Sequence, residues 1–312
     1  MAHRKIKRNF DILSTFDYFV PGPAEILILL ALLVAGLFLG ALLGLPILFL
    51  TQGSESSLLY FELISYPVMF IPPMIYASYK SRSNSFFGTG LKISNDHYKP
   101  LGGWMCAILV VAGTLTGSFV SDALASLLPP MPDSLTEALK AVTSGNILLN
   151  LLCVSVFAPF FEEWLCRGMV LRGLLAYEHK DKNGETVKGI KPVWAIVISA
   201  AFFALIHLNP WQAIPAFLMG LLLGYVYYRT GSIKLTMLMH CANNTFAVVM
   251  ANIDKFKDIE SWSDVMPALF YAALLFFCAA AVLYVVYKFK EIRLLDPQGS
   301  FETVNPFDGA SA

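Results

Sequence analysis

The chain has 312 residues, of which 57% are hydrophobic and only 14% are charged, and its mean hydropathy is +0.64. Soluble domains carry roughly 25% charged residues, so this composition excludes a soluble domain and predicts a polytopic protein surrounded by membrane lipid. The net charge is zero and the 22 basic residues form no long block, so nucleic acid is not an expected partner.

Eight apolar segments reach or approach the roughly 20 residues that a helix needs to cross the hydrocarbon core. The expected fold class is therefore all-α, a polytopic integral membrane protein with about eight transmembrane helices. The first segment is too long for the apolar part of a signal peptide, so we expect it to remain in the protein. The expected spans are residues 24–50, 57–79, 102–128, 147–171, 192–208, 211–228, 235–252 and 265–287.

One integral domain is expected, because no connection is long enough to hold another fold. The tail after Arg293 is polar, and such a terminus is typical of disorder. In chain order, the expected parts are a cytoplasmic N-terminal segment (1–23), three helices with an outer amphipathic connector (24–146), four catalytic helices (147–252), the eighth helix (253–288) and a cytoplasmic polar tail (289–312).

The distribution of Lys and Arg predicts the orientation. With a cytoplasmic N-terminus, 18 of the 22 basic residues fall in cytoplasmic segments, three fall in outer connections, and Arg167 lies within the membrane. Because Lys and Arg are enriched on the cytoplasmic side, both termini are expected there. In a bacterial cell the protein would lie in the inner membrane.

Three local patterns predict details of the connections and of packing. Ser134-Leu-Thr-Glu137 is a capping box, which predicts a short amphipathic helix through about residue 142 that would cover a site from the membrane surface. Asn183-Gly184 predicts a tight turn in the inner connection 178–191. Glycines at every fourth position of the first span, residues 36, 40 and 44, predict close approach of another helix.

Glu162, Glu163 and Arg167 lie within the fourth apolar segment. A charged group at bilayer depth costs roughly 2.5 to 3.5 kcal/mol on insertion scales, so these residues need partners or a function. Four residues separate Glu163 from Arg167, which puts the two on one helix face as an ion pair. Glu162 lies about 100 degrees around the helix and is left for chemistry. A purely structural role for the pair has about equal weight.

Two histidines and an asparagine lie at membrane depth on other spans. His207 closes the fifth, and His240 with Asn244 shares one face of the seventh. A lone buried histidine is more often a hydrogen-bonded core residue than a catalytic one. Together with the glutamates, however, the three predict one polar cavity, because scattered polar groups in lipid would be costly. Asn243 competes with Asn244, and only helical phase favours the latter.

The sequence leaves the depth of His207 in the membrane open, and three further acidic residues lie near the ends of predicted spans. Counting about 1.5 Å per residue places His207 nearer the outer face than Glu162, unless the turn at Pro210 is sunk into the membrane or the fifth helix begins below its surface. Glu62 and Asp122, like Glu25, lie near the predicted ends of spans, so we interpret them as interfacial residues.

The order of these motifs resembles that of a known family. Glu162-Glu163-x-x-x-Arg167, Phe203-x-x-x-His207 and His240-x-x-x-Asn244 are similar to the three motifs of the CAAX protease and bacteriocin-processing (CPBP, Abi) family of intramembrane proteases, which includes the type II prenyl-protein endopeptidases. The resemblance covers about residues 147 to 250, and no motif position departs from it.

The resemblance implies an endopeptidase that cleaves a membrane-associated peptide or protein. It implies that Glu162 and His207 activate a water molecule, that His240 and Asn244 stabilise the oxyanion, and that Glu163 and Arg167 shape the site. Elementary chemistry agrees, because asparagine donates hydrogen bonds but is no base, whereas a carboxylate beside a histidine suits a base.

Alternatives remain open at this stage. Glu162, His207 and His240 could instead bind a catalytic Zn²⁺, leaving the fourth position for water, although the familiar His-Glu-x-x-His arrangement is absent. We place metal-free catalysis slightly ahead. A non-proteolytic immunity or binding protein on the same scaffold would be expected to lose a motif residue, and none is lost. A transporter is least favoured, because no matching broken helices recur in the two halves.

Overall fold

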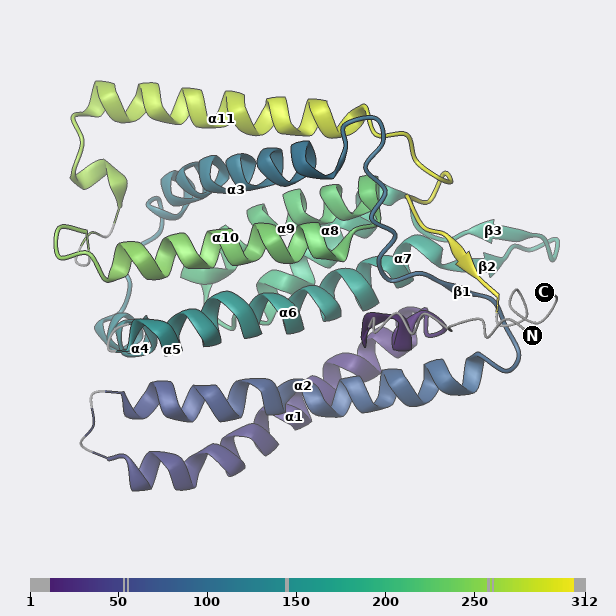
Figure 1. The fold of residues 1–312 in the computed structure, drawn as a ribbon, viewed down its shortest axis with the longest axis horizontal. Coiled ribbons are helices and arrows are strands. Elements are labelled where there is room, and N and C mark those ends of the chain that lie inside the picture. Colours follow the sequence, from purple (N-terminus) through teal and green to yellow (C-terminus); the bar gives the residue numbers. More distant parts are fainter. Residues whose placement is uncertain are drawn as a thin grey trace, which may run out of the picture.

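The computed structural model describes residues 12–305 apart from 53, 55, 144, 145, 257, 258 and 260. Helices lie side by side along the long axis of the molecule, and its short strands gather at one end (Figure 1). Every expected span is helical, so the all-α membrane fold is confirmed. The helices are α1 (Pro23–Leu50), α2 (Ser57–Asn84), α3 (Gly103–Ala125), a composite helix (Ile147–Ala176), α8 (Pro192–Leu205), α9 (Pro210–Thr230), α10 (Ile233–Ala251) and α11 (Ala268–Lys290).

Five of these helices in the described part of the chain are long and apolar enough to cross a membrane: α1, α2, α3, the composite helix and α11. α8 has 14 residues and therefore extends only about 21 Å, less than the hydrocarbon thickness. The turn that follows α8 carries His207 and leads into α9 at Pro210. Because α8 is short, the turn at Pro210 would lie inside the membrane, which would bring His207 closer to the depth of Glu162.

The composite helix changes its winding around the two glutamates. Short α-helical pieces, α5 (Ile147–Asn150), α6 (Ala158–Glu163) and α7 (Arg172–Ala176), alternate with two π-helical pieces, η2 (Leu151–Phe157) and η3 (Trp164–Leu171). In η2 the N–H of Ala158 donates to the carbonyl of Cys153, five residues back. The next residue, Pro159, has no N–H to donate, so the carbonyl of Val154 is left without its helical partner. π-Helical turns are rare and occur frequently at functional sites.

α1 and α2 form a hairpin in which the backbones approach closely. A Cβ added to Gly40 would collide with the backbone carbonyl of Ser65, and one added to Gly44 would lie 2.7 Å from the ring of Phe61. The packing role predicted for this glycine repeat is confirmed. The hairpin matters for the site because α2 brings Tyr66 to it.

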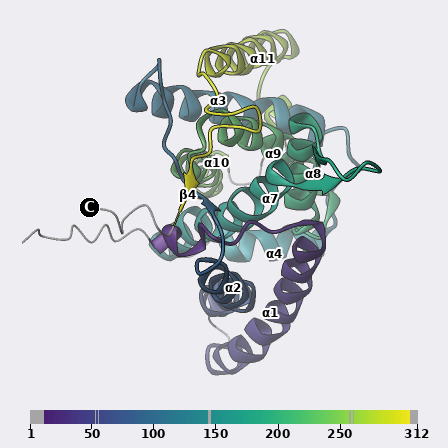
Figure 2. The same cartoon turned by 90° about the vertical axis from the view of Figure 1, so that its right-hand side faces the viewer.

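One end of the bundle, called here the strand end, gathers the short strands into a cap over the helices (Figures 1 and 2). Segment 294–305 folds back there and buries Phe301, so the disorder expected for the tail is wrong for these residues. The 178–191 connection forms a β-hairpin around the turn predicted at Asn183-Gly184. The elements of the cap are η1 (Ile12–Phe16), β1 (Gly90–Leu91) paired with β4 (Thr303–Val304), and β2 (Glu178–Lys180) paired with β3 (Thr186–Lys188).

The opposite end, called here the α4 end, carries α4 (Asp133–Thr143) and the 3₁₀ turn η4 (Trp262–Asp264) (Figure 1). α4 is the short amphipathic helix predicted from the sequence, although it begins one residue before Ser134. η4 is fastened to α3, because a carboxylate oxygen of Asp122 accepts hydrogen bonds from the hydroxyl of Ser261 at 3.0 Å and from the N–H of Trp262 at 3.2 Å.

Candidate active site

A cavity of about 1390 Å³ lies among α1, α2, α3, α6, α8, α9 and α10. The side chains of Glu162, His207, His240 and Asn244 all line it, as does that of Asn243. The structure therefore brings the candidate residues from three separate segments of the chain to one cavity, as expected.

The ion pair expected between Glu163 and Arg167 is present and fully buried. Arg167 Nη1 donates to Glu163 Oε1 at 2.7 Å, and both side chains are 0% exposed. Nη2 of the same arginine lies 3.3 Å from the carbonyl of Gly220 on α9, and its guanidinium lies over the ring of Phe203. Arg167 thus joins the composite helix to α8 and α9.

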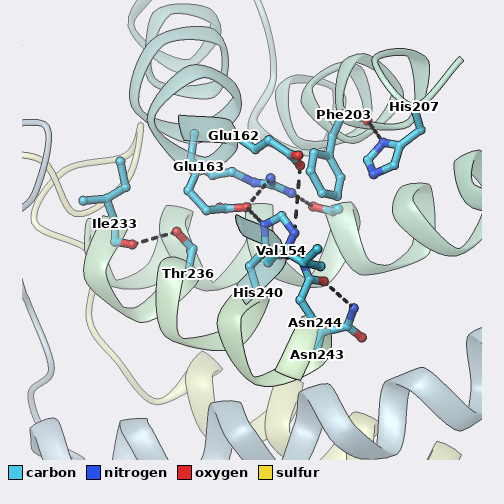
Figure 3. Close-up of polar contacts among 12 residues, drawn as sticks. Val154, Glu162, Glu163, Phe203, His207, Ile233, Thr236, His240, Asn243 and Asn244 are labelled. Atoms are coloured by element: carbon cyan, nitrogen blue, oxygen red, sulfur yellow. Dashed lines mark hydrogen bonds and ion pairs between the residues drawn. The ribbon is translucent and has the colours of Figure 1, made fainter. Parts of the chain in front are cut away.

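Glu163 has a second partner that helical phase did not predict. His240 Nδ1 lies 3.1 Å from the same Oε1 atom of Glu163 (Figure 3). A carboxylate only accepts hydrogen bonds, so this contact assigns a proton to Nδ1 of His240. The glutamate consequently fixes both the ring orientation and the tautomer of a histidine that lines the cavity.

Glu162 turns to the other side and contacts different groups. Its Oε1 accepts a hydrogen bond from the hydroxyl of Tyr66, a residue of α2. Its Oε2 lies 3.9 Å from His240 Nε2, too far for a direct hydrogen bond, and has no hydrogen-bond partner among the described residues. Although Glu162 is only 7% exposed, this oxygen remains free to accept a proton.

Asn244 is held by the carbonyl that Pro159 leaves free. Its Nδ2 donates to Val154 O at 2.8 Å, and its Oδ1 accepts from Asn243 Nδ2 at 3.1 Å (Figure 3). Asn243 in turn accepts a hydrogen bond from Ser118 on α3. A side-chain amide carries two hydrogens, so Asn244 keeps a second N–H for another acceptor.

His207 lies apart from the other candidates. Its Nδ1 is 2.8 Å from the carbonyl oxygen of Phe203. The Phe203 ring contacts the rings of His207 and His240 edge to face, with distances of 5.1 and 5.4 Å between ring centroids (Figure 3). Donation from Nδ1 to that carbonyl leaves Nε2 as the acceptor nitrogen. No hydrogen bond or ion pair joins His207 to Glu162 in the described structure.

The sequence did not reveal Tyr66 or the carbonyl of Val154 as parts of the site. Tyr66 is one of 13 tyrosines and lies far from every motif. For Val154 the sequence offers only Pro159, five residues later. A proline has no N–H, so it indicates a backbone carbonyl without a helical partner, but it does not indicate which side chain binds that carbonyl. Glu62 and Asp122, interpreted from the sequence as interfacial, line the same cavity.

The three candidate metal ligands do not form one group in the described part of the chain. Among the described residues, no group of three or more His, Cys, Asp or Glu side chains is placed to hold a metal ion. Phe203 between the two imidazoles is the physical reason that Glu162, His207 and His240 do not converge on one point.

Comparison with known families gives one match. Residues 144–246 of the 312 match a family model described as type II CAAX prenyl endopeptidase Rce1-like. Neither the curated proteins nor the solved structures that were compared with the chain match it. The matched segment contains all six candidate residues, and the resemblance inferred from the three motifs is confirmed. Over residues 144–246, about a third of its length, the chain is therefore similar to the Rce1-like family of type II CAAX prenyl endopeptidases.

Proposed function

We propose that the protein is an endopeptidase that hydrolyses a peptide bond of a membrane-associated protein or peptide inside this cavity. The observation that carries the proposal is the division between the two adjacent glutamates. Glu163 is neutralised by Arg167 and holds His240, whereas Glu162 lines the cavity and keeps one buried carboxylate oxygen without a hydrogen-bond partner among the described residues. The family match over the same residues supports it.

Glu162 acts as the general base in this proposal. A water molecule at Oε2 loses its proton to the carboxylate as its oxygen attacks the carbonyl carbon of the peptide. Tyr66, which donates to Oε1, keeps the carboxylate oriented. A positioned base contributes typically 100- to 10,000-fold to the rate of such a step.

The oxyanion that forms on the carbonyl oxygen needs donors. In the proposal His240 Nε2, when protonated, and the second N–H of Asn244 supply them, because both side chains line the cavity and are held by Glu163 and the carbonyl of Val154. One preorganised donor is worth about 100 to 1000-fold in turnover. His207, with Nε2 as an acceptor, takes part in water activation or proton transfer once substrate and Phe203 have adjusted.

Reconstituted protein tests the proposal. Proteoliposomes would be incubated with a panel of membrane-inserted peptides, and new termini would be identified by mass spectrometry. Wild type should produce defined fragments, and the variants Glu162→Gln and His207→Ala should produce none while unfolding at the wild-type temperature. Unchanged fragments from folded Glu162→Gln would contradict the mechanism. A Glu185→Gln variant, altered at the strand end, serves as the matched control.

A zinc-dependent reaction would use the same three side chains. It is distinguished from the metal-free reaction by the metal content of the purified protein, together with its activity. We propose that purified, active protein contains no stoichiometric transition metal and keeps its turnover after exhaustive chelation. Loss of turnover on chelation, restored by Zn²⁺ in a one-to-one ratio, would establish the metal-dependent reaction instead.

A further inference from the structure

Ser118 and Asn243 line the cavity with Asn244, and neither has a part in the proposed reaction so far. Ser118 lies on α3, outside residues 144–246, so the family match does not include it. Asn243 is the neighbour that competed with Asn244 for the asparagine role in the sequence. Hydrogen bonds join Ser118 to Asn243 and Asn243 to Asn244, so both residues are placed to act through Asn244.

The direction of these hydrogen bonds is determined by the backbone carbonyl of Val154. A carbonyl only accepts, so the atom of Asn244 that lies 2.8 Å from it is the amide nitrogen. The amide oxygen of Asn244 then faces Asn243 and needs a donor, which is the amide nitrogen of Asn243 at 3.1 Å. The amide oxygen of Asn243 is consequently the atom that faces Ser118.

The hydroxyl of Ser118 supplies the first hydrogen of this chain of bonds. Its oxygen lies 2.7 Å from the amide oxygen of Asn243 and 2.9 Å from the carbonyl of Thr114 on its own helix. A hydroxyl has one hydrogen to donate. Donation to Thr114 alone would leave two oxygens 2.7 Å apart with no hydrogen between them, so the contact with Asn243 requires donation from Ser118.

All the donors of the chain are aligned in one direction, from α3 through α10 to the composite helix. Hydrogen bonds in such a chain polarise one another, with a strengthening of perhaps 10 to 30% for each bond. An amide that accepts at its oxygen therefore becomes a stronger donor at its nitrogen. In Asn244 one N–H is used by Val154, and the second N–H, assigned above to the oxyanion, is the one that gains.

We infer that Asn243 and Ser118 are positioning residues that orient and polarise the carboxamide of Asn244, the donor assigned to the oxyanion. The inference rests on the proposed function, because the oxyanion is that of the proposed hydrolysis. It makes α3, which carries none of the three motifs, a part of the active site.

Kinetics in proteoliposomes distinguish this role from simple packing or substrate binding. With a membrane-inserted peptide that the wild type cleaves, Asn243→Leu should lower kcat at least about tenfold, short of the roughly 100- to 1000-fold loss of a whole oxyanion donor, and should leave KM within about twofold. Ser118→Ala, one bond further away, should lower kcat by a smaller factor. An unchanged kcat of folded Asn243→Leu, with or without a change in KM, would overturn the inference.

Thr116→Ala is the matched control for Ser118→Ala. The hydroxyl of Thr116 also lies on α3, but it donates within its own helix, to the carbonyls of Ala112 and Gly113 at 2.8 and 3.3 Å. Thr116 is not among the described residues that line the cavity. This variant should keep the kcat and the KM of the wild type.

The side-chain amide signal of Asn244 gives a readout that needs no turnover. It would be recorded by NMR in detergent on protein with isotopically labelled asparagine side chains, and it would be identified by its loss in Asn244→Ala. Ser118→Ala should shift this signal, although no hydrogen bond joins Ser118 to Asn244 among the described residues. In an Asn243→Leu background the same serine substitution should no longer shift it.

The two readouts separate this inference from the proposed function. A protein whose Asn244 signal responds as expected but that cleaves no peptide keeps the orientation of the amide and refutes the proposed activity. A protein that cleaves peptides while its Asn244 signal ignores Ser118→Ala keeps the activity and refutes the chain of hydrogen bonds.

Discussion

At the scale of single residues, Glu163 carries two contacts through one oxygen atom, to Arg167 and to His240. Removing its charge would leave the arginine buried and unpaired, and breaking a buried pair in this way costs about 3 to 5 kcal/mol. We therefore expect Glu163→Gln to unfold at a clearly lower temperature than Glu162→Gln when both are heated in detergent. Equal unfolding temperatures for the two variants would show that the division between the glutamates is wrong.

The hydrogen bond from Tyr66 to Glu162, which the three motifs do not include, can be tested by a single substitution. The Tyr66→Phe variant removes the hydroxyl that donates to Glu162 and leaves the ring in place. A hydrogen bond to a charged group is worth about 1.5 to 3 kcal/mol, so we expect turnover to fall roughly tenfold or more with the fold unchanged. Tyr60→Phe, six residues earlier on α2, is the matched control and should keep wild-type turnover.

At the scale of elements, the π-helical turn before Pro159 supplies the carbonyl that holds Asn244. In the Pro159→Ala variant the alanine N–H competes with Asn244 for that carbonyl. Replacing a proline inside a helix also stabilises the helix itself, by up to about 3 kcal/mol. Turnover should fall although thermal stability is unchanged or higher.

Pro46→Ala is the control for this prediction, since Pro46 also lies inside a helix but on α1, away from the cavity. Its effect on turnover should be small. If Pro159→Ala also kept full turnover, the carbonyl of Val154 would not be needed to position Asn244.

The α1–α2 hairpin offers a second test at this scale. Gly40→Ala would drive a methyl group into the backbone of Ser65, one residue before Tyr66, whereas Gly117→Ala on α3 would meet Val282 at an ordinary 3.8 Å. Overpacking of this kind costs typically 1 to 3 kcal/mol. We expect Gly40→Ala to lower the unfolding temperature and turnover together, with Gly117→Ala near wild type in both.

At the scale of the whole molecule, the sequence was enough to predict the helices, because apolar length and turn residues decide each span locally. It also predicted the Glu163–Arg167 pair, which depends only on helical spacing. It could not predict contacts between distant elements, such as Tyr66 with Glu162 or His240 with Glu163, because these depend on how helices pack. The folded tail was missed for the same reason: Phe301 is buried by neighbours far away in sequence.

The central claim is that Glu162 of the folded protein hydrolyses a peptide bond in the cell. Its most direct test is a proteomic comparison of protein termini in cells that carry either the wild type or Glu162→Gln at equal abundance. We predict at least one new N- or C-terminus, in a membrane-associated protein, that is present with the wild type and missing with Glu162→Gln. Identical sets of termini, with both proteins folded and in the membrane, would contradict the account.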